Sequence, residues 1–261
     1  MEPVDLPSGP PELEGLELVA DVSAGDWIRD RLRPWDPVAL KVWTIVPSEF
    51  EAYARIFHPA TIWTLREGEE TPDVRFVRWS EVAEWSGRTI VPGRDWEFIA
   101  TRDDGARWDE QPYHADPPEG DAYEDLFLAL ARVLGPFTGT PGSVWYAVWD
   151  GWGDWQMDRA IPRLELPART YVLFRGALDA LSRLRVGGGP SWFRTPALTW
   201  PDDRAWCVAC EIDYRSTFIA GSRRAIDAVL AEPELESIEV RADDIAETSV
   251  ESWPDEGMGQ S

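Results

Sequence analysis

The chain has 261 residues, with 25 lysines and arginines against 48 aspartates and glutamates, so its formal net charge is −23. Nucleic acids and anionic membranes are also negatively charged, and this composition therefore excludes non-specific binding to either. Hydrophobic residues make up 44% of the chain, which is enough for a packed core and excludes disorder throughout.

The sequence shows no secretory signal peptide and no membrane-spanning segment, and the expected cellular compartment rests on these two points. Its start, Met1-Glu-Pro-Val-Asp5, has neither the basic nor the apolar segment of a secretory signal peptide. No run of about 18 apolar residues occurs, so we predict no membrane-spanning helix. We expect a soluble cytoplasmic protein that binds neither nucleic acid nor membrane.

The negative charge lies mainly at the two ends. Residues 1–26 contain seven acidic and no basic residues, and residues 232–261 contain ten acidic residues and one basic residue. Together they carry −16, which leaves −7 for the 205 residues between them. We expect residues 1–15 and 249–261 to be flexible, because they are polar and acidic.

We predict that residues 16–248 form a single unit. If it divides into two lobes, they meet near residues 101–120, which are rich in Asp, Gly and Pro. The first half should contain an edge strand, a short helix, a buried strand, a longer helix, a half-solvated strand and a second short helix. In that order, these occupy residues 16–22, 27–32, 38–46, 48–58, 74–79 and 80–85.

The segment between Ser48 and Pro59 has the signature of a helix. Ser48 and Glu51 have the spacing of a capping box, in which each side chain binds the backbone N–H of the other. Tyr53 and Phe57 are four residues apart, as on one face of a helix, and Pro59 ends the segment.

A second capping box, Asp121 and Glu124, precedes the clearest helix of the sequence, which ends at Gly135-Pro136. Further strands are expected at residues 143–149, 169–174, 206–213 and 238–240, and further helices at residues 176–184 and 222–230. Strands and helices mix without strict alternation. We therefore predict an α+β fold with a mixed or antiparallel sheet and several short packed helices.

The two cysteines, Cys207 and Cys210, follow a tryptophan as in the Trp-Cys-x-x-Cys motif of thioredoxin-like proteins. Here the alternating sequence around them is typical of a strand, on which residues three apart point to opposite faces. Their sulfur atoms cannot then bond to each other. We expect two buried structural cysteines rather than a redox pair.

The same strand pattern places Glu211 and Asp213 on one face, about 7 Å apart. This spacing suits a pair of acid–base carboxylates or a divalent cation. The alternative is a strand whose outer face is charged, or an ion pair with Arg204 or Arg215.

Tryptophans and aspartates crowd residues 143–156, namely Trp145, Trp149, Asp150, Trp152, Asp154 and Trp155. Trp145 and Trp149 share a strand face and are expected in the core. Trp152 and Trp155 follow a turn, so they are the candidate ligand-binding residues. An aromatic ring beside carboxylates suits a sugar or a cation, which makes Asp150 and Asp154 further catalytic candidates.

Metal and cofactor motifs do not occur. His58 precedes Pro59 and is assigned a structural role, and His114 is a single histidine in an acidic loop. The sequence contains no nucleophile elbow, phosphate-binding glycine loop or zinc-protease helix. We predict no metal and no cofactor.

Several blocks resemble an uncharacterised protein family of high-GC Gram-positive bacteria. They are Tyr53-Ala-Arg-Ile-Phe-His-Pro-Ala60, Arg78-Trp-Ser-Glu-Val-Ala83, Val148-Trp-Asp-Gly-Trp-Gly153 and Trp200-Pro-Asp-Asp-Arg-Ala-Trp-Cys-Val-Ala-Cys-Glu-Ile-Asp213. The resemblance extends from about residue 35 to residue 240. It implies one integrated unit, and it transfers no catalytic residue because no activity is established for that family.

The sequence shows no assembled nucleophile, base or metal set. We therefore predict a non-catalytic binding or interaction protein, whose acidity favours a basic protein partner. The alternative is a hydrolase of a sugar-like or polar substrate, with Asp150, Asp154, Glu211 or Asp213 acting beside Trp152. Carboxylates that converge in a tryptophan-lined cleft would favour the hydrolase.

Overall fold

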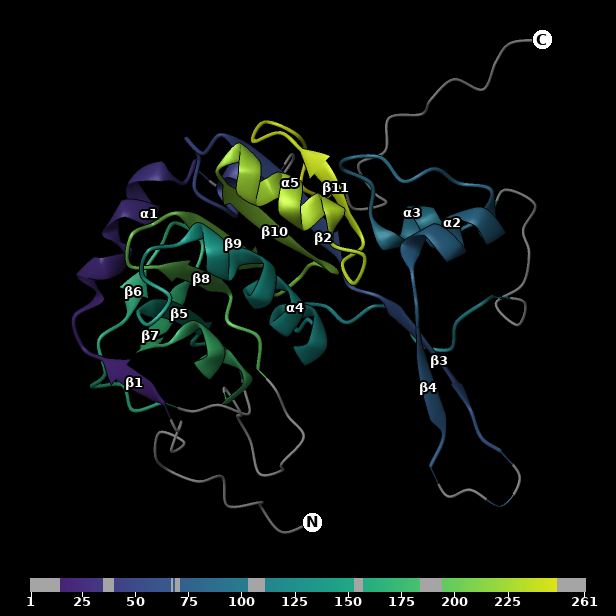
Figure 1. The fold of residues 1–261 in the computed structure, drawn as a ribbon, viewed down its shortest axis with the longest axis horizontal. Coiled ribbons are helices and arrows are strands. Elements are labelled where there is room, and N and C mark those ends of the chain that lie inside the picture. Colours follow the sequence, from purple (N-terminus) through teal and green to yellow (C-terminus); the bar gives the residue numbers. More distant parts are fainter. Residues whose placement is uncertain are drawn as a thin grey trace.

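The fold comes from a computed structural model that describes residues 15–34, 40–66, 68, 71–102, 111–152, 157–183 and 194–247. These residues contain a nine-stranded antiparallel sheet in the order β1-β7-β5-β8-β9-β10-β2-β11, with β6 also paired to β7 (Figure 1). The strands are β1 (Leu16–Val19), β2 (Ala52–Phe57), β5 (Val144–Trp149), β6 (Leu164–Glu165), β7 (Thr170–Gly176), β8 (Leu198–Pro201), β9 (Trp206–Cys210), β10 (Ser216–Gly221) and β11 (Ser237–Val240).

The central strands β8, β9, β10 and β2 are buried along their whole length. Along β9, Trp206, Val208 and Cys210 belong to the core on one face of the sheet, whereas Cys207 and Ala209 belong to the core on the other. The predicted alternation is thus confirmed, although the strand ends three residues earlier than expected.

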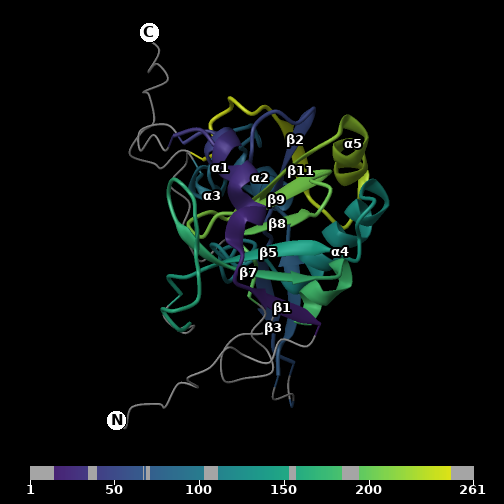
Figure 2. The ribbon, with the colours of Figure 1, turned by 90° about the vertical axis from the view of Figure 1, so that its left-hand side faces the viewer.

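Short helices cover both faces of the sheet, which Figure 2 shows from the side. The helices α4 (Glu124–Leu134) and α5 (Arg223–Ala231) lie on one face, and α1 (Asp26–Arg31) lies on the other. Phe127 and Leu130 on α4 are buried against the sheet. An antiparallel sheet with short packed helices is the α+β fold that the sequence predicts.

A third apolar core lies beside the carboxyl end of β2, where α2 (Trp79–Ser86) and α3 (Trp96–Ala100) pack together. From it β3 (Ala60–Thr64) and β4 (Asp73–Val77) project away from the main sheet as a two-stranded antiparallel ribbon (Figure 1). We call this pair of strands the ribbon. The ribbon extends beyond the core, and so most of β4 is exposed to solvent.

The helix predicted between Ser48 and Pro59 is wrong, because this segment contains the strand β2. Both residues of the expected capping box bind distant groups instead: the Ser48 hydroxyl donates to the Arg31 carbonyl (2.7 Å), and Glu51 accepts from the Arg223 N–H (2.8 Å). β2 pairs with β10 on one side and β11 on the other. These long-range ladders outweigh the local signal.

Two other local predictions are also wrong. The strand expected at residues 38–46 is, in its described part, an isolated bridge at Lys41 followed by a 3-10 helix, η2 (Val42–Thr44). The capping box at the start of α4 does not form, because Asp121 accepts a hydrogen bond from the Thr195 N–H (3.0 Å) and Tyr123 takes the N-cap position.

Parts of several predictions fall outside the described residues: the chain ends at 1–14 and 248–261, and residues 103–110 of the expected lobe boundary. The single unit over residues 16–248 therefore stays a prediction. No helix in the described ranges combines the length and the apolar character needed to cross a bilayer.

Candidate functional site

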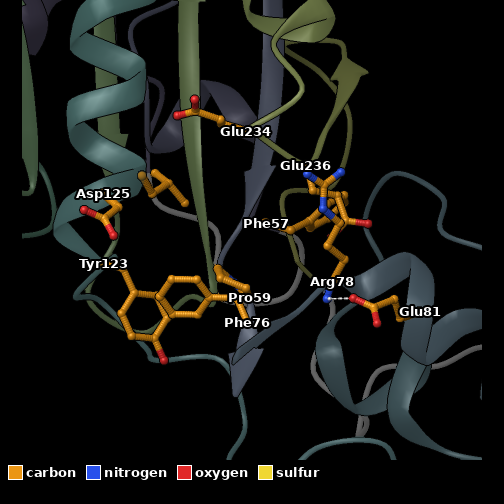
Figure 3. A pocket seen from close by; sticks show the side chains of 10 residues that line it. Phe57, Pro59, Phe76, Arg78, Glu81, Tyr123, Asp125, Glu234 and Glu236 are labelled. Carbon is orange, nitrogen blue, oxygen red and sulfur yellow. Dashed lines mark hydrogen bonds between the residues drawn. The ribbon is translucent and has the colours of Figure 1, made fainter. Parts of the chain in front are cut away.

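A cleft of about 300 Å³ opens where the ribbon leaves the main sheet (Figure 3). Its walls come from the end of β2, from β4, from the starts of α2 and α4, and from the loop between α5 and β11. The lining residues are Phe57, Pro59, Phe76, Arg78, Glu81, Tyr123, Asp125, Leu126, Glu234 and Glu236. We call this cavity the ribbon cleft.

Two aromatic rings form the floor of the ribbon cleft. Phe76 on β4 and Tyr123 before α4 lie with their ring centroids 4.5 Å apart, tilted by 49° (Figure 3). Phe76 remains 41% exposed, and Tyr123 is half-buried, which raises the pKa of its hydroxyl. The floor is therefore an aromatic surface that a ligand can reach.

Two of the four carboxylates around the cleft hold the fold together. Glu236 accepts hydrogen bonds from the N–H groups of Trp79 (2.6 Å) and Ser80 (2.7 Å), and so it caps the start of α2 from a distant loop. Glu81 is paired with Arg75 at 2.8 Å. Glu81 also accepts a hydrogen bond from the Arg78 N–H (3.0 Å), and this bond and Arg75 lower its pKa against the opposing effect of burial.

The other two carboxylates face solvent. Asp125 has no hydrogen-bond or ion-pair partner within the described part of the chain. Glu234 pairs with Arg132 (2.8 Å) on the outer side of α4. Arg78 is the one basic residue of the lining, and its guanidinium donates to the Pro233 carbonyl. The lining thus has four carboxylates and one guanidinium, while Arg75 and Arg132 outside the lining pair with Glu81 and Glu234. A small excess of negative charge remains, and it includes the Asp125 carboxylate.

Glu211 and Asp213, the first pair of predicted site residues, are brought together by a shared arginine. Nη2 of Arg169 lies 2.5 Å from Oε1 of Glu211 and 2.6 Å from Oδ2 of Asp213. Burial raises the pKa of Glu211, and the adjacent Arg169 opposes that shift. The geometry is that of an ion pair, but its partner is Arg169 rather than the expected Arg204 or Arg215.

Asp150 and Trp152, from the second predicted group, also have arginine partners. Asp150 pairs with Arg163 at 2.8 Å. The Trp152 ring is covered by the Arg194 guanidinium, 4.0 Å from its centroid, and meets the edge of Trp149 at 5.4 Å. One face of the Trp152 ring is therefore occupied.

Two predicted site residues, Asp154 and Trp155, lie outside the described residues. Over the described ranges, no three His, Cys, Asp or Glu side chains lie close enough to hold a metal ion. His58 is buried, with Nδ1 against the Pro118 carbonyl (2.8 Å) and Nε2 against the Thr217 hydroxyl (2.9 Å), and burial lowers its pKa to about 4.

Both cysteines are buried and unbonded. Cys207 faces one core and Cys210 the other, as predicted. Burial raises the pKa of both thiols, that of Cys210 to about 12. Thiols of this kind are protonated at neutral pH and therefore unreactive.

The sequence does not reveal the ribbon cleft, because its residues come from four separate parts of the chain. Phe76, Tyr123 and Glu234 are far apart in the sequence and lie together only in the fold. One local pattern was present in the sequence: β4 alternates apolar residues with arginine. The structure shows that most of this strand is exposed, its apolar residues included.

No protein-family model, no curated protein and no solved structure matches the chain. The resemblance described above therefore stays a prediction.

Proposed function

We propose that the chain is a non-catalytic binding protein, and that its ribbon cleft takes a cationic side chain of a basic partner protein. The observation that carries this proposal is the reachable aromatic floor of Phe76 and Tyr123 beside an excess of carboxylates. A guanidinium or ammonium group is attracted both to the face of an aromatic ring and to nearby carboxylates.

The whole-chain charge supports the same class of partner. A net charge of −23 raises the rate at which a basic protein encounters the surface, and salt weakens that attraction. The carboxylates considered for a hydrolase are held in ion pairs: Glu211 and Asp213 share Arg169, and Asp150 pairs with Arg163. This pairing supports a non-catalytic function. The free buried thiols support the further proposal of a soluble cytoplasmic protein.

The test uses tetra-arginine, blocked at both ends, in a calorimetric titration at low and at physiological salt. We expect saturable binding that weakens with salt. The double variant Asp125→Asn/Glu234→Gln should lower the affinity about tenfold, by removing two carboxylates that face the ligand.

A matched control carries the same charge change elsewhere. Glu17 on β1 and Asp30 on α1 are exposed and far from the cleft, so Glu17→Gln/Asp30→Asn should retain the affinity within about twofold. An equal loss in both double variants, or no binding by the wild type, would contradict the proposal.

A further inference from the structure

The two faces of the ribbon differ in chemistry. In an antiparallel pair, residues directly opposite each other share a face, and so do residues two apart along a strand. One face therefore carries Trp63 opposite Val74 and Thr61 opposite Phe76. The other carries Ile62 opposite Arg75 and Thr64 opposite Asp73.

The apolar face is exposed to solvent only in part, because Thr61 is buried and the Trp63 ring lies 4.6 Å from that of His114. Trp63 is 42% exposed, Val74 62% and Phe76 41%, and Leu65, which continues the alternation after β3, is 62% exposed. Only six large apolar side chains are this exposed within the described ranges, and four of them lie on the ribbon or directly after β3. We call Trp63, Leu65, Val74 and Phe76 the ribbon face. A concentration of this kind marks an interaction surface.

The ribbon face continues into the ribbon cleft. Phe76 belongs to both, because its ring contacts Tyr123 on the cleft floor. Along β4, Val74 is two residues further out, or about 7 Å at the rise of a strand. Carboxylates thus surround one end of a continuous surface, and apolar side chains form the other end.

We propose that one amphipathic basic segment of the partner protein occupies both parts, with apolar side chains on the ribbon face and a basic side chain in the ribbon cleft. This inference rests on the proposed function and names the chemistry of the partner. Charge complementarity selects the occupant. A second copy of this chain would bring two cleft rims and two charges of −23 together, and an anionic membrane would be repelled.

The test compares two blocked peptides of equal charge, Leu-Ser-Leu-Ser-Arg-Arg-Arg-Arg and Ser-Ser-Ser-Ser-Arg-Arg-Arg-Arg, by calorimetry. The leucines should raise the affinity for the wild type at least tenfold. Leu65→Ser/Val74→Thr should reduce that advantage to threefold or less, while leaving the affinity for the serine peptide within twofold. Both positions are exposed, so the variant should fold, and its circular dichroism and melting temperature check this.

Val91 provides the matched control, because it is 40% exposed but lies outside the ribbon. Val91→Thr should retain the full advantage of the leucine peptide. If the wild type binds both peptides equally, the ribbon face is not part of the site, although the proposed function survives. If Val91→Thr loses as much as the ribbon variant, the gain is general hydrophobicity and the inference fails. If neither peptide binds, the proposed function fails with it.

Discussion

Two groups of carboxylates in this molecule differ in how far the chain itself neutralises them. We call Glu211, Asp213 and Arg169 the closed group, and the carboxylates and rings of the ribbon cleft the open group. Around Arg169, Glu211 and Asp213 share one guanidinium, and Trp149 lies beneath it at 5.3 Å, so the charges and the ring satisfy one another. Around the ribbon cleft, Asp125 has no partner among the described residues, and the rings of Phe76 and Tyr123 are open to solvent. The residue types are the same. Arg169 pairs with both carboxylates of the first group, whereas the chain pairs some carboxylates of the second group and leaves that of Asp125 unpaired among the described residues.

The largest expected effect on stability comes from removing the arginine of the closed group. Arg169→Ala leaves Glu211 buried without a counter-charge, which should cost about 3–5 kcal/mol in the free energy of unfolding, measured by urea denaturation. Adding Glu211→Gln should recover part of that loss, because the remaining group is neutral. Arg132→Ala, at an exposed ion pair, should have a much smaller effect, because solvent screens the pair. An equally small effect of Arg169→Ala would show that the closed group is not a structural ion pair.

A second buried ion pair, Arg55 with Glu247, also separates pairing inside the fold from the exposed carboxylates of the cleft. Arg55 is fully buried, and Nη2 lies 3.4 Å from Oε2 of Glu247, with Asp95, Glu97 and Arg215 also facing that carboxyl. Burial raises the pKa of Glu247 to about 7, although Arg55 opposes the shift. The folded state then holds a proton that the unfolded state has lost between about pH 4.5 and 7.

The free energy of unfolding should consequently fall as the pH rises through this window, by about 3 kcal/mol for this group alone, and level off above it. Glu247→Gln should flatten that slope in denaturation curves between pH 5 and pH 8. Glu239→Gln, at an exposed residue of β11, should leave it unchanged. A slope that persists in Glu247→Gln would assign the titration to another group.

The smallest expected effect is on ligand affinity and comes from changing Tyr123 in the open group. Tyr123→Leu removes an aromatic face but keeps an apolar side chain, so the affinity for tetra-arginine should fall about two- to fivefold. Tyr123→Phe keeps the ring and should bind as the wild type does. Equal affinities of the phenylalanine and leucine variants would remove the aromatic floor from the binding site.

The fold was predictable where one segment decides its own structure. In α4, apolar residues recur at helical spacing, and the predicted helix at residues 222–230 is α5, which the Ser222 hydroxyl caps by accepting from the Ala225 N–H (3.2 Å). Strand β2 was not predictable in this way. Its capping-box residues bind Arg31 and Arg223 instead, and Glu51 lies 172 residues from its partner in the sequence.

The sites follow the same rule. Glu211 and Asp213 were expected on one face of a strand, but both follow the end of β9 at Cys210, so that premise is wrong. They lie close together because both bind Arg169. Their partner Arg169 precedes β7, more than 40 residues away, so the closure of that group could not be predicted. The ribbon cleft joins the end of β2, β4, α4 and the loop before β11, which are far apart in the sequence and meet only through tertiary packing.

The most direct test asks where a cation binds. Backbone amide resonances of the isotope-labelled protein can be followed by NMR during titration with tetra-arginine. The largest saturable shifts should occur at Phe76, Tyr123 and Asp125, with little change at Trp149 and Glu211. If the largest shifts occur at Trp149 and Glu211 instead, the closed group is the binding site and the central claim is wrong.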